Sequence, residues 1–224
     1  IKLPNNLKII LTGSGRVANG VKEILCCLNI LNVSKDEFVS KKFTQPVYVQ
    51  LSTLDYNQRV DGSKSSKKDF YINPDKYTSC MGNYIDHADM LITGHFYAEH
   101  SPYILTKNHL SNTSKLKVVG DISCDIGGPI VSTIRPSTIS KPIYGYNISK
   151  GVEDDYFKDD CIAVMAVDNL PCSLPKDASI DFGNVFIKQV LDDLINNGPI
   201  VSKASITLNG HLTERFRYLA DYVN

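Results

Sequence analysis

The sequence lacks an excess of charge of either sign, because its 224 residues include 24 basic and 24 acidic side chains. Nucleic acids and acidic membranes select for basic surfaces, so we expect neither as a main partner. No apolar run approaches the roughly 20 residues of a membrane span, and the residues before the first predicted strand contain no secretory h-region. With 42% hydrophobic residues, the composition is that of a soluble globular protein with a sizeable core.

Short metal-binding and redox motifs are missing as well. The six cysteines form no C-x-x-C pair, which argues against a zinc knuckle or a redox pair and favours reduced thiols in a cytoplasm. Four histidines fall within 23 positions, but they do not share one helix face and form no H-E-x-x-H motif: His87, His95, His100 and His109. We therefore predict no metal site.

The start of the chain contains a pattern that is typical of dinucleotide-binding proteins. After the apolar residues 7–12, Gly13, Gly15 and Ala18 give G-x-G-x-x-A. Gly13 allows a tight turn, Gly15 lets the backbone approach a diphosphate, and Ala18 lets helix and strand pack closely. Ser14, Arg16 and Val17 complete the turn and the helix start, whose free N–H groups attract phosphate. The pattern alone leaves a plain structural turn and a methyltransferase glycine loop open.

Apolar periodicity and turn residues predict an alternation of strands and helices along the chain. We expect strands within residues 7–12, 28–33, 46–51, 88–93, 116–121 and 161–167. We expect helices over residues 17–28 and 73–85, a long amphipathic helix from Pro175 to the Gly198-Pro199 pair, and a final helix over 212–222. The polar residues 55–68 are predicted to form a solvated loop. The alternation is typical of an α/β fold with a doubly wound, mainly parallel Rossmann-type sheet and helices on both faces.

Glycine and polar residues follow several of these strands. The carboxyl ends of parallel strands meet at one edge of the sheet, where nucleotides bind. We therefore predict further cofactor contacts from Ser34, Gly94, His95, Asp121, Asp125, Asp168 and Asn169. Ser34, with Lys35 beside it, favours NADP weakly over NAD, although the following acidic residues are also typical of a helix start. Asp121 and Asp125 are also explained by turn capping.

Several segments occur in the order of one known family: 12–20, 121–128, 167–171, 182–183 and 206–218. The chain resembles the lysine–oxoglutarate reductase half of bifunctional lysine-degrading enzymes, within the saccharopine dehydrogenase and alanine dehydrogenase/transhydrogenase superfamily. The resemblance covers nearly the whole chain. It implies an NAD(P)-binding Rossmann domain over residues 1–171, and a helical segment over 172–224 that packs on an N-terminal substrate domain. The chain begins at Ile1 without a methionine, so we expect that domain to be missing here.

The resemblance also implies a reaction: hydride transfer between NAD or NADP and a C=N bond formed from an amino acid and a 2-oxo acid, such as lysine and 2-oxoglutarate. It places Asp125 beside the nicotinamide ribose in a supporting catalytic role, and Asp168, Asn169 and Leu170 in the same cleft. The acid–base residues would belong to the missing domain.

One position departs from the family pattern. Val131 stands where the family has a glutamate, which favours a different, alanine-dehydrogenase-like amino-acid substrate. A nucleotide-sensing module without catalysis is the alternative function, and a homo-oligomer remains compatible with the sequence.

Overall fold

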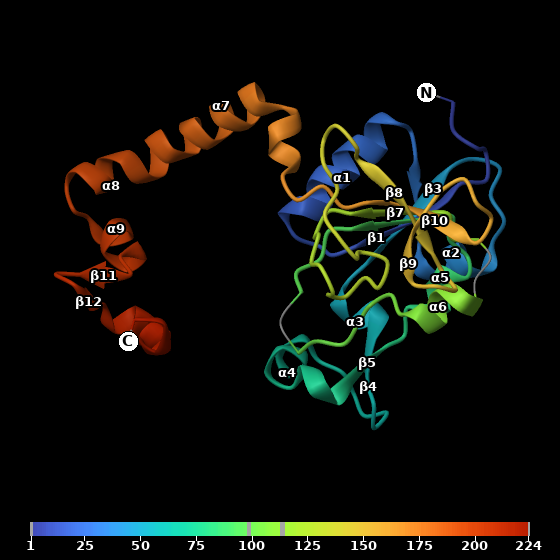
Figure 1. The fold of residues 1–224 in the computed structure, drawn as a ribbon, viewed down its shortest axis with the longest axis horizontal. Helices are drawn as coiled ribbons and strands as arrows, with labels where there is room; N and C mark the ends of the chain where they lie inside the picture. Colours follow the sequence, from blue (N-terminus) through green and yellow to red (C-terminus); the bar gives the residue numbers. More distant parts are fainter. Residues whose placement is uncertain (1, 98–99, 113–114, 224) are drawn as a thin grey trace. The chain divides into compact units, whose positions relative to one another are not determined.

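The computed structural model describes residues 2–97, 100–112 and 115–223. It divides the chain into two compact units, which comprise residues 1–169 and 170–224 (Figure 1). Each unit is considered by itself below. No helix in the described ranges is long and apolar enough to cross a membrane.

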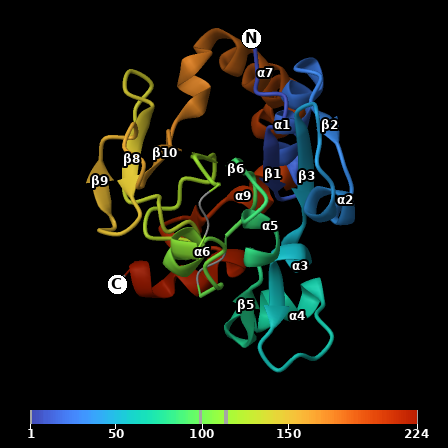
Figure 2. The same ribbon diagram turned by 90° about the vertical axis from the view of Figure 1, so that its right-hand side faces the viewer.

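The first unit is built around one eight-stranded sheet in the order β2-β3-β1-β6-β7-β10-β8-β9. Its strands are β1 (Lys8–Thr12), β2 (Leu31–Asn32), β3 (Val47–Leu51), β6 (Met90–Thr93), β7 (Val118–Asp121), β8 (Ile143–Asn147), β9 (Val152–Asp154) and β10 (Cys161–Met165). The strands from β2 to β10 in this order pair in parallel, and β8 and β9 add antiparallel pairs. Figure 2 shows β9 and β2 at opposite edges. The predicted Rossmann-type sheet is confirmed.

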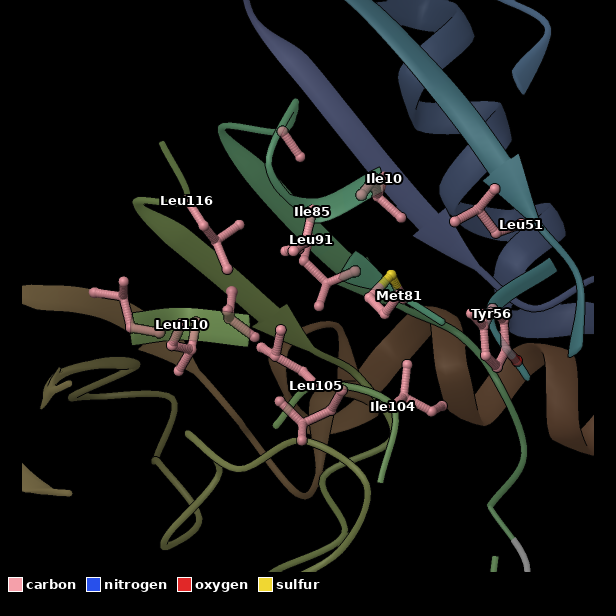
Figure 3. Close-up of a cluster of buried hydrophobic side chains, with 14 of the residues drawn as sticks. Ile10, Leu51, Tyr56, Met81, Ile85, Leu91, Ile104, Leu105, Leu110 and Leu116 are labelled. Atoms are coloured by element: carbon pink, nitrogen blue, oxygen red, sulfur yellow. The ribbon is translucent and has the colours of Figure 1, made fainter. Parts of the chain in front are cut away.

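The helices of this unit cover both faces of the sheet. They are α1 (Arg16–Cys27), α2 (Lys35–Ser40), α3 (Thr53–Tyr56), α4 (Lys67–Ile72), η1 (Pro74–Lys76), α5 (Gly82–Ile85) and α6 (Lys107–Asn112). Side chains alternate along a strand. Ile9 and Leu11 of β1 therefore pack with Leu25 of α1, whereas Ile10 joins the cluster on the other face with α2, α5 and α6 (Figure 3).

The strand beside β1 differs from the prediction. Of the strand expected within residues 28–33, only the two exposed residues of β2 form a strand, at the edge of the sheet. β3 lies between β2 and β1. The register pairs Thr12 with Leu51, so the chain that leaves β3 at Ser52 lies next to the Gly13 turn. In this fold the residues that bind the cofactor ribose follow the strand beside β1, which here is β3.

The predicted helix over 73–85 is wrong, and the predicted loop over 55–68 is confirmed only for its middle part, residues 60–66. This region forms α3, then the antiparallel pair β4 (Asn57–Arg59) and β5 (Tyr77–Ser79) with α4 and η1 between the two strands. Arg59 pairs with Asp61 and Asp69, and the Tyr77 hydroxyl donates to Asp69 at 2.8 Å. Ion pairs on one arginine thus order a polar stretch that has no apolar periodicity. In Figure 1 this insert, residues 53–79, lies beyond the end of β3.

The second unit contains helical segments and one short hairpin. Its elements are η2 (Leu170–Ser173), α7 (Pro175–Phe186), the π-helical η3 (Ile187–Leu191), α8 (Asp192–Ile195), α9 (Pro199–Ala204), β11 (Thr207–Leu208), β12 (His211–Leu212) and η4 (Glu214–Tyr222). The long helix that begins at Pro175 is confirmed. The final helix begins only at Glu214 and is a 3-10 helix, because Leu212 pairs within the hairpin. No described residue of this unit is buried, and Phe182 is 72% exposed.

Candidate cofactor-binding site

The glycine turn joins the end of β1 to the start of α1. Gly13 has a φ of +93°, and a Cβ there would overlap the Gly94 carbonyl oxygen and lie 2.9 Å from the Cα of His95. Both the backbone conformation and the packing therefore require glycine at this position. Gln50 of β3 donates a hydrogen bond to the Gly13 carbonyl at 2.9 Å and fixes the turn from the other side.

Gly15 shows the opposite situation. It is the N-cap of α1 with φ −88° and ψ −165°, a conformation open to every residue type. A Cβ at Gly15 would meet no described atom within 4 Å. Neither the backbone nor the packing of the protein requires a glycine here. The open space instead lies where a ligand would approach the unpaired N–H groups of the first turn of α1.

Gly94 and Ala18 keep α1 close to the strand exits. Ala18 is fully buried, and a Cβ at Gly94 would lie 3.1 Å from the Ala18 backbone nitrogen. Larger side chains at either position would push the helix start away from the sheet. Gly94 and Ala18 therefore support the turn from behind.

A pocket of about 510 Å³ opens at this turn. Seven residues predicted from the sequence line it: Gly13, Ser14, Gly15, Arg16, Val17, Gly94 and His95. Sequence reasoning missed four others: Thr53, Tyr56, Tyr71 and Phe96. Three of these belong to the insert 53–79, and identifying them needed the order of β3 in the sheet. The capping pattern at Ser52, with Asp55 three residues later, was the available signal for the start of α3.

Charge in the pocket is low and positive. Arg16 is the only Lys, Arg, Asp or Glu among the described lining residues. The nearby carboxylate of Asp55 accepts from the Lys35 ammonium at 2.5 Å and from the Ser52 N–H at 2.7 Å. Its negative charge is thereby paired with the positive charge of Lys35.

His95 is buried at the back of the pocket. Its Nδ1 lies 2.7 Å from the Thr12 hydroxyl, and its ring packs beside Tyr56. Burial lowers the pKa of His95 to about 4, against a smaller opposite effect of the Asp121 carboxylate. The imidazole is therefore neutral at neutral pH.

The prediction that Ser34 contacts the cofactor is wrong in its structural basis. Ser34 follows the edge strand β2 and not the strand beside β1. Its hydroxyl accepts from the Glu37 N–H at 3.3 Å, and the Glu37 carboxylate accepts from the Ser34 N–H at 3.1 Å. This reciprocal pair is a capping box at the start of α2. The alternative interpretation as a helix start is the correct one.

The strand exits meet at one edge as predicted. The sheet register pairs Thr12 of β1 with Thr93 of β6, and Thr93 with Asp121 of β7. Asp121 is fully buried and accepts from the hydroxyls of Thr93, Ser123 (2.6 Å) and Thr133 (2.5 Å) and from the Cys124 N–H (3.1 Å). Every one of these partners belongs to the protein itself. Asp121 thus shapes the loop after β7, and its contact with a cofactor stays a prediction.

Asp125 and Asp168 lie on the β7–β10 side of this edge, outside the pocket lining. Burial and the neighbouring Asp121 charge raise the pKa of Asp125, while Asp168 and Asn169 are exposed. Burial raises the pKa of the Cys124 thiol, and the charges of Asp121, Asp168 and Asp125 raise it further. Leu170 opens the second unit, so its position relative to them is not defined.

Comparison with known proteins identifies the fold family. Residues 49–215 match the family described as alanine dehydrogenase/PNT, C-terminal domain. The chain belongs to this family. The match begins within β3 and so does not include the glycine turn, whereas the curated relatives cover 95% of the chain.

No three His, Cys, Asp or Glu side chains in the described ranges are placed to share a metal ion.

The chain is similar to proteins named alpha-aminoadipic semialdehyde synthase. It is 27% identical over 239 residues to the Arabidopsis thaliana protein and 27% identical over 246 residues to the Mus musculus protein. The Bos taurus protein is 24% identical over 248 residues. The chain spans 22% of the Arabidopsis protein and 27% of the two mammalian ones, so it corresponds to about a quarter of these relatives.

Proposed function

We propose that the chain is the nicotinamide-cofactor-binding domain of an oxidoreductase that acts on a C–N bond of an amino acid. The observation that carries the proposal is the open space at Gly15, above the free N–H groups of α1. Neither the backbone conformation nor the packing requires a glycine there, and the absence of a side chain leaves the helix start open to a ligand. Membership of the alanine dehydrogenase/PNT family supports a dinucleotide as that ligand.

The glycine turn would hold the diphosphate of the cofactor. The N–H groups of Gly15, Arg16 and Val17 lie at the start of α1, where the helix dipole favours an anion. Ser14 adds a hydroxyl at the pocket wall. Gly94 and Ala18 would contribute by keeping the turn close to the sheet.

NADP is the cofactor that the pocket favours. In NAD-binding Rossmann domains a carboxylate near the end of the neighbouring strand binds the ribose hydroxyls, and in NADP-binding ones an arginine accommodates the 2′-phosphate. Here β3 ends at Ser52, Asp55 is paired with Lys35, and Arg16 is the charged residue of the pocket lining.

The nicotinamide would lie toward the β7–β10 side, beside Asp125, with Asp168 and Asn169 along the same cleft. When bound, the nicotinamide supplies or accepts the hydride. Asp125 is half-buried and carries a raised pKa, so its protonation is sensitive to a nearby charge. An iminium charge on the substrate would favour its ionised form, which is an electrostatic contribution to catalysis.

The substrate pair that we propose is lysine with 2-oxoglutarate, as in a saccharopine-type reaction. Val131 favours the second candidate, an alanine-dehydrogenase-like reaction with another amino acid. Its side chain packs against the buried cluster of the sheet and offers no charge to an amino substrate. The acid–base residues would lie in a substrate domain outside this chain, so we expect this chain alone to be catalytically silent. We assign residues 1–171 to cofactor binding and 172–224 to packing on that substrate domain.

The compartment that we propose is the cytoplasm. All six cysteines are free in the structure, as reduced thiols would be. The mouse and cattle relatives carry the word mitochondrial in their names. Localisation of the full-length protein by fluorescence microscopy decides between the two compartments.

Titration with NADPH and NADH, followed by nicotinamide fluorescence, tests the proposal. We expect saturable binding of NADPH, and weaker binding of NADH. Absence of binding of either at millimolar concentration would contradict the proposal. An assay of the full-length protein with lysine, 2-oxoglutarate and NADPH then separates the candidates. Turnover with these substrates favours the saccharopine-type reaction and removes a purely sensing role.

A further inference from the structure

His95 contains an unsatisfied polar atom beneath the glycine turn. The residue is only 8% exposed, and its Nε2 is buried with no hydrogen-bond partner among the described residues. Buried polar atoms are nearly always paired, so one that is not calls for an explanation. Its position is specific, since the Cα of His95 is among the atoms in closest contact with Gly13.

The contact with Thr12 determines which ring nitrogen carries the proton. Nδ1 lies 2.7 Å from the Thr12 hydroxyl, which has no other hydrogen-bond partner in the described ranges. Donation from the hydroxyl to an unprotonated Nδ1 leaves only one group unpaired, whereas the reverse direction would leave both the buried hydroxyl proton and Nε2 without partners. A neutral imidazole in this arrangement carries its proton on Nε2. The unpartnered atom is therefore a hydrogen-bond donor without an acceptor.

Among the described residues, no hydrogen-bond acceptor reaches this donor. The Asp121 carboxylate makes no hydrogen bond to the ring, and its two oxygens already accept from Thr93, Ser123, Cys124 and Thr133. Tyr56 packs against the imidazole as a ring, with 6.2 Å between the centroids. The pocket that His95 lines also contains Arg16, whose guanidinium is a hydrogen-bond donor and cannot accept from Nε2.

We propose that His95 binds the cofactor directly, by donating a hydrogen bond from Nε2 to an oxygen of the diphosphate. The proposal rests on the proposed function and deepens it. A diphosphate on the Gly13–Val17 turn would be the nearest acceptor to a residue packed against Gly13. A charged acceptor also makes this bond stronger than one between two neutral groups.

Binding has to rearrange the pocket wall for this bond to form, since Nε2 is shielded from solvent in the free chain. Phe96, the next residue, is 81% exposed and lines the same pocket, so little of its surface is held by packing. The donor would then gain its partner only in the complex. The Nε2 donor is unpaired in the free chain and would be paired in the complex.

Nitrogen-15 NMR of the histidine side chains in the full 224-residue chain tests the proposal directly. In the free chain, we expect the imidazole of His95 to have an unprotonated Nδ1 and a protonated Nε2 and to stay neutral at pH 5, and the signals that His95→Leu removes identify it. Adding NADPH should shift the Nε2 signal of this residue. Saturation of the chain by NADPH with that signal unmoved would overturn the proposal.

Cofactor affinity supplies a second readout. We expect His95→Leu to weaken NADPH binding by roughly ten- to a hundred-fold, the range for one hydrogen bond to a charged group. His211→Leu, an exposed histidine in the second unit, is the matched control and should bind as wild type does. Thr12→Val should also weaken binding, because Nδ1 loses the donor that fixes the tautomer. Wild-type affinity in both His95→Leu and Thr12→Val would contradict the proposal.

These results are distinguishable from a failure of the proposed function. A wild-type chain that binds neither NADPH nor NADH would contradict the proposed function itself. A wild-type chain that binds NADPH, with a His95 signal and affinity that do not respond, would contradict the role of His95 alone.

Discussion

The two halves of the carboxyl edge of the sheet use their functional groups in opposite ways. On the β7 side, the Asp121 carboxylate is saturated by four hydrogen bonds from within the protein. On the β1–β6 side, Gly15 faces open space, α1 has no side-chain cap and His95 has an unpaired nitrogen. A conspicuous carboxylate at a strand end thus serves the fold, whereas the side that leaves groups unpaired is suited to a ligand.

Asp121→Ala should have the largest effect on stability. The substitution leaves three hydroxyls and one N–H without their charged acceptor, which is a fully buried carboxylate. We expect a loss of about 4 kcal/mol in the free energy of unfolding, measured by urea denaturation. Asp159→Ala, at an exposed aspartate, is the control and should change little. A loss below about 1 kcal/mol for Asp121→Ala would show that the network is not structural.

Gly13→Ala should come next, because it combines an unfavourable φ with an overlap on Gly94. We expect a loss of about 2–4 kcal/mol in the free energy of unfolding. Gly62→Ala is the matched control, since Gly62 also has a positive φ but no neighbour within 4 Å. It should cost only about 1 kcal/mol. Equal losses at the two positions would indicate that the contact with Gly94 contributes nothing.

His95 should make the chain sensitive to acid. Its folded pKa of about 4 lies below the 6.5 of the unfolded chain, so between these values the unfolded state binds more protons. Stability is therefore retained above pH 6.5 and is lost as the pH falls toward 4. From pH 7 to pH 5 this group should cost about 2 kcal/mol. His95→Leu should lack that part of the loss, and an unchanged pH dependence would be inconsistent with a buried neutral imidazole.

Gly15→Ala should have the smallest effect on stability. Its backbone conformation is ordinary and its Cβ would meet nothing, so we expect a change within about 0.5 kcal/mol. Gly20→Ala, inside α1 and equally free of neighbours, should raise stability by up to about 1 kcal/mol through helix propensity. The cofactor affinity of Gly20→Ala should stay at the wild-type value. Thermal unfolding of both variants at pH 7 measures these changes.

The sequence predicted the parts of the fold that depend on local patterns. β1, β3, β6, β7 and β10 are buried strands and appear as short apolar runs, and the glycine turn follows from spacing alone. β8 and β9 were not predicted.

The order of the strands could not be predicted, because pairing depends on contacts distant in sequence. Placing β3 beside β1 decides that the wall of the pocket comes from the insert and not from Ser34. The insert itself is held by Arg59 and its carboxylate partners, which give no periodic signal.

The central claim is that the space at Gly15 belongs to a cofactor. The most direct test is NADPH binding by Gly15→Val, measured by nicotinamide fluorescence on a chain whose folding is checked by thermal unfolding. We predict a variant that unfolds close to the wild-type temperature and shows no NADPH binding, because the side chain fills the approach to the α1 N–H groups. A folded Gly15→Val chain with wild-type affinity for NADPH would contradict the account.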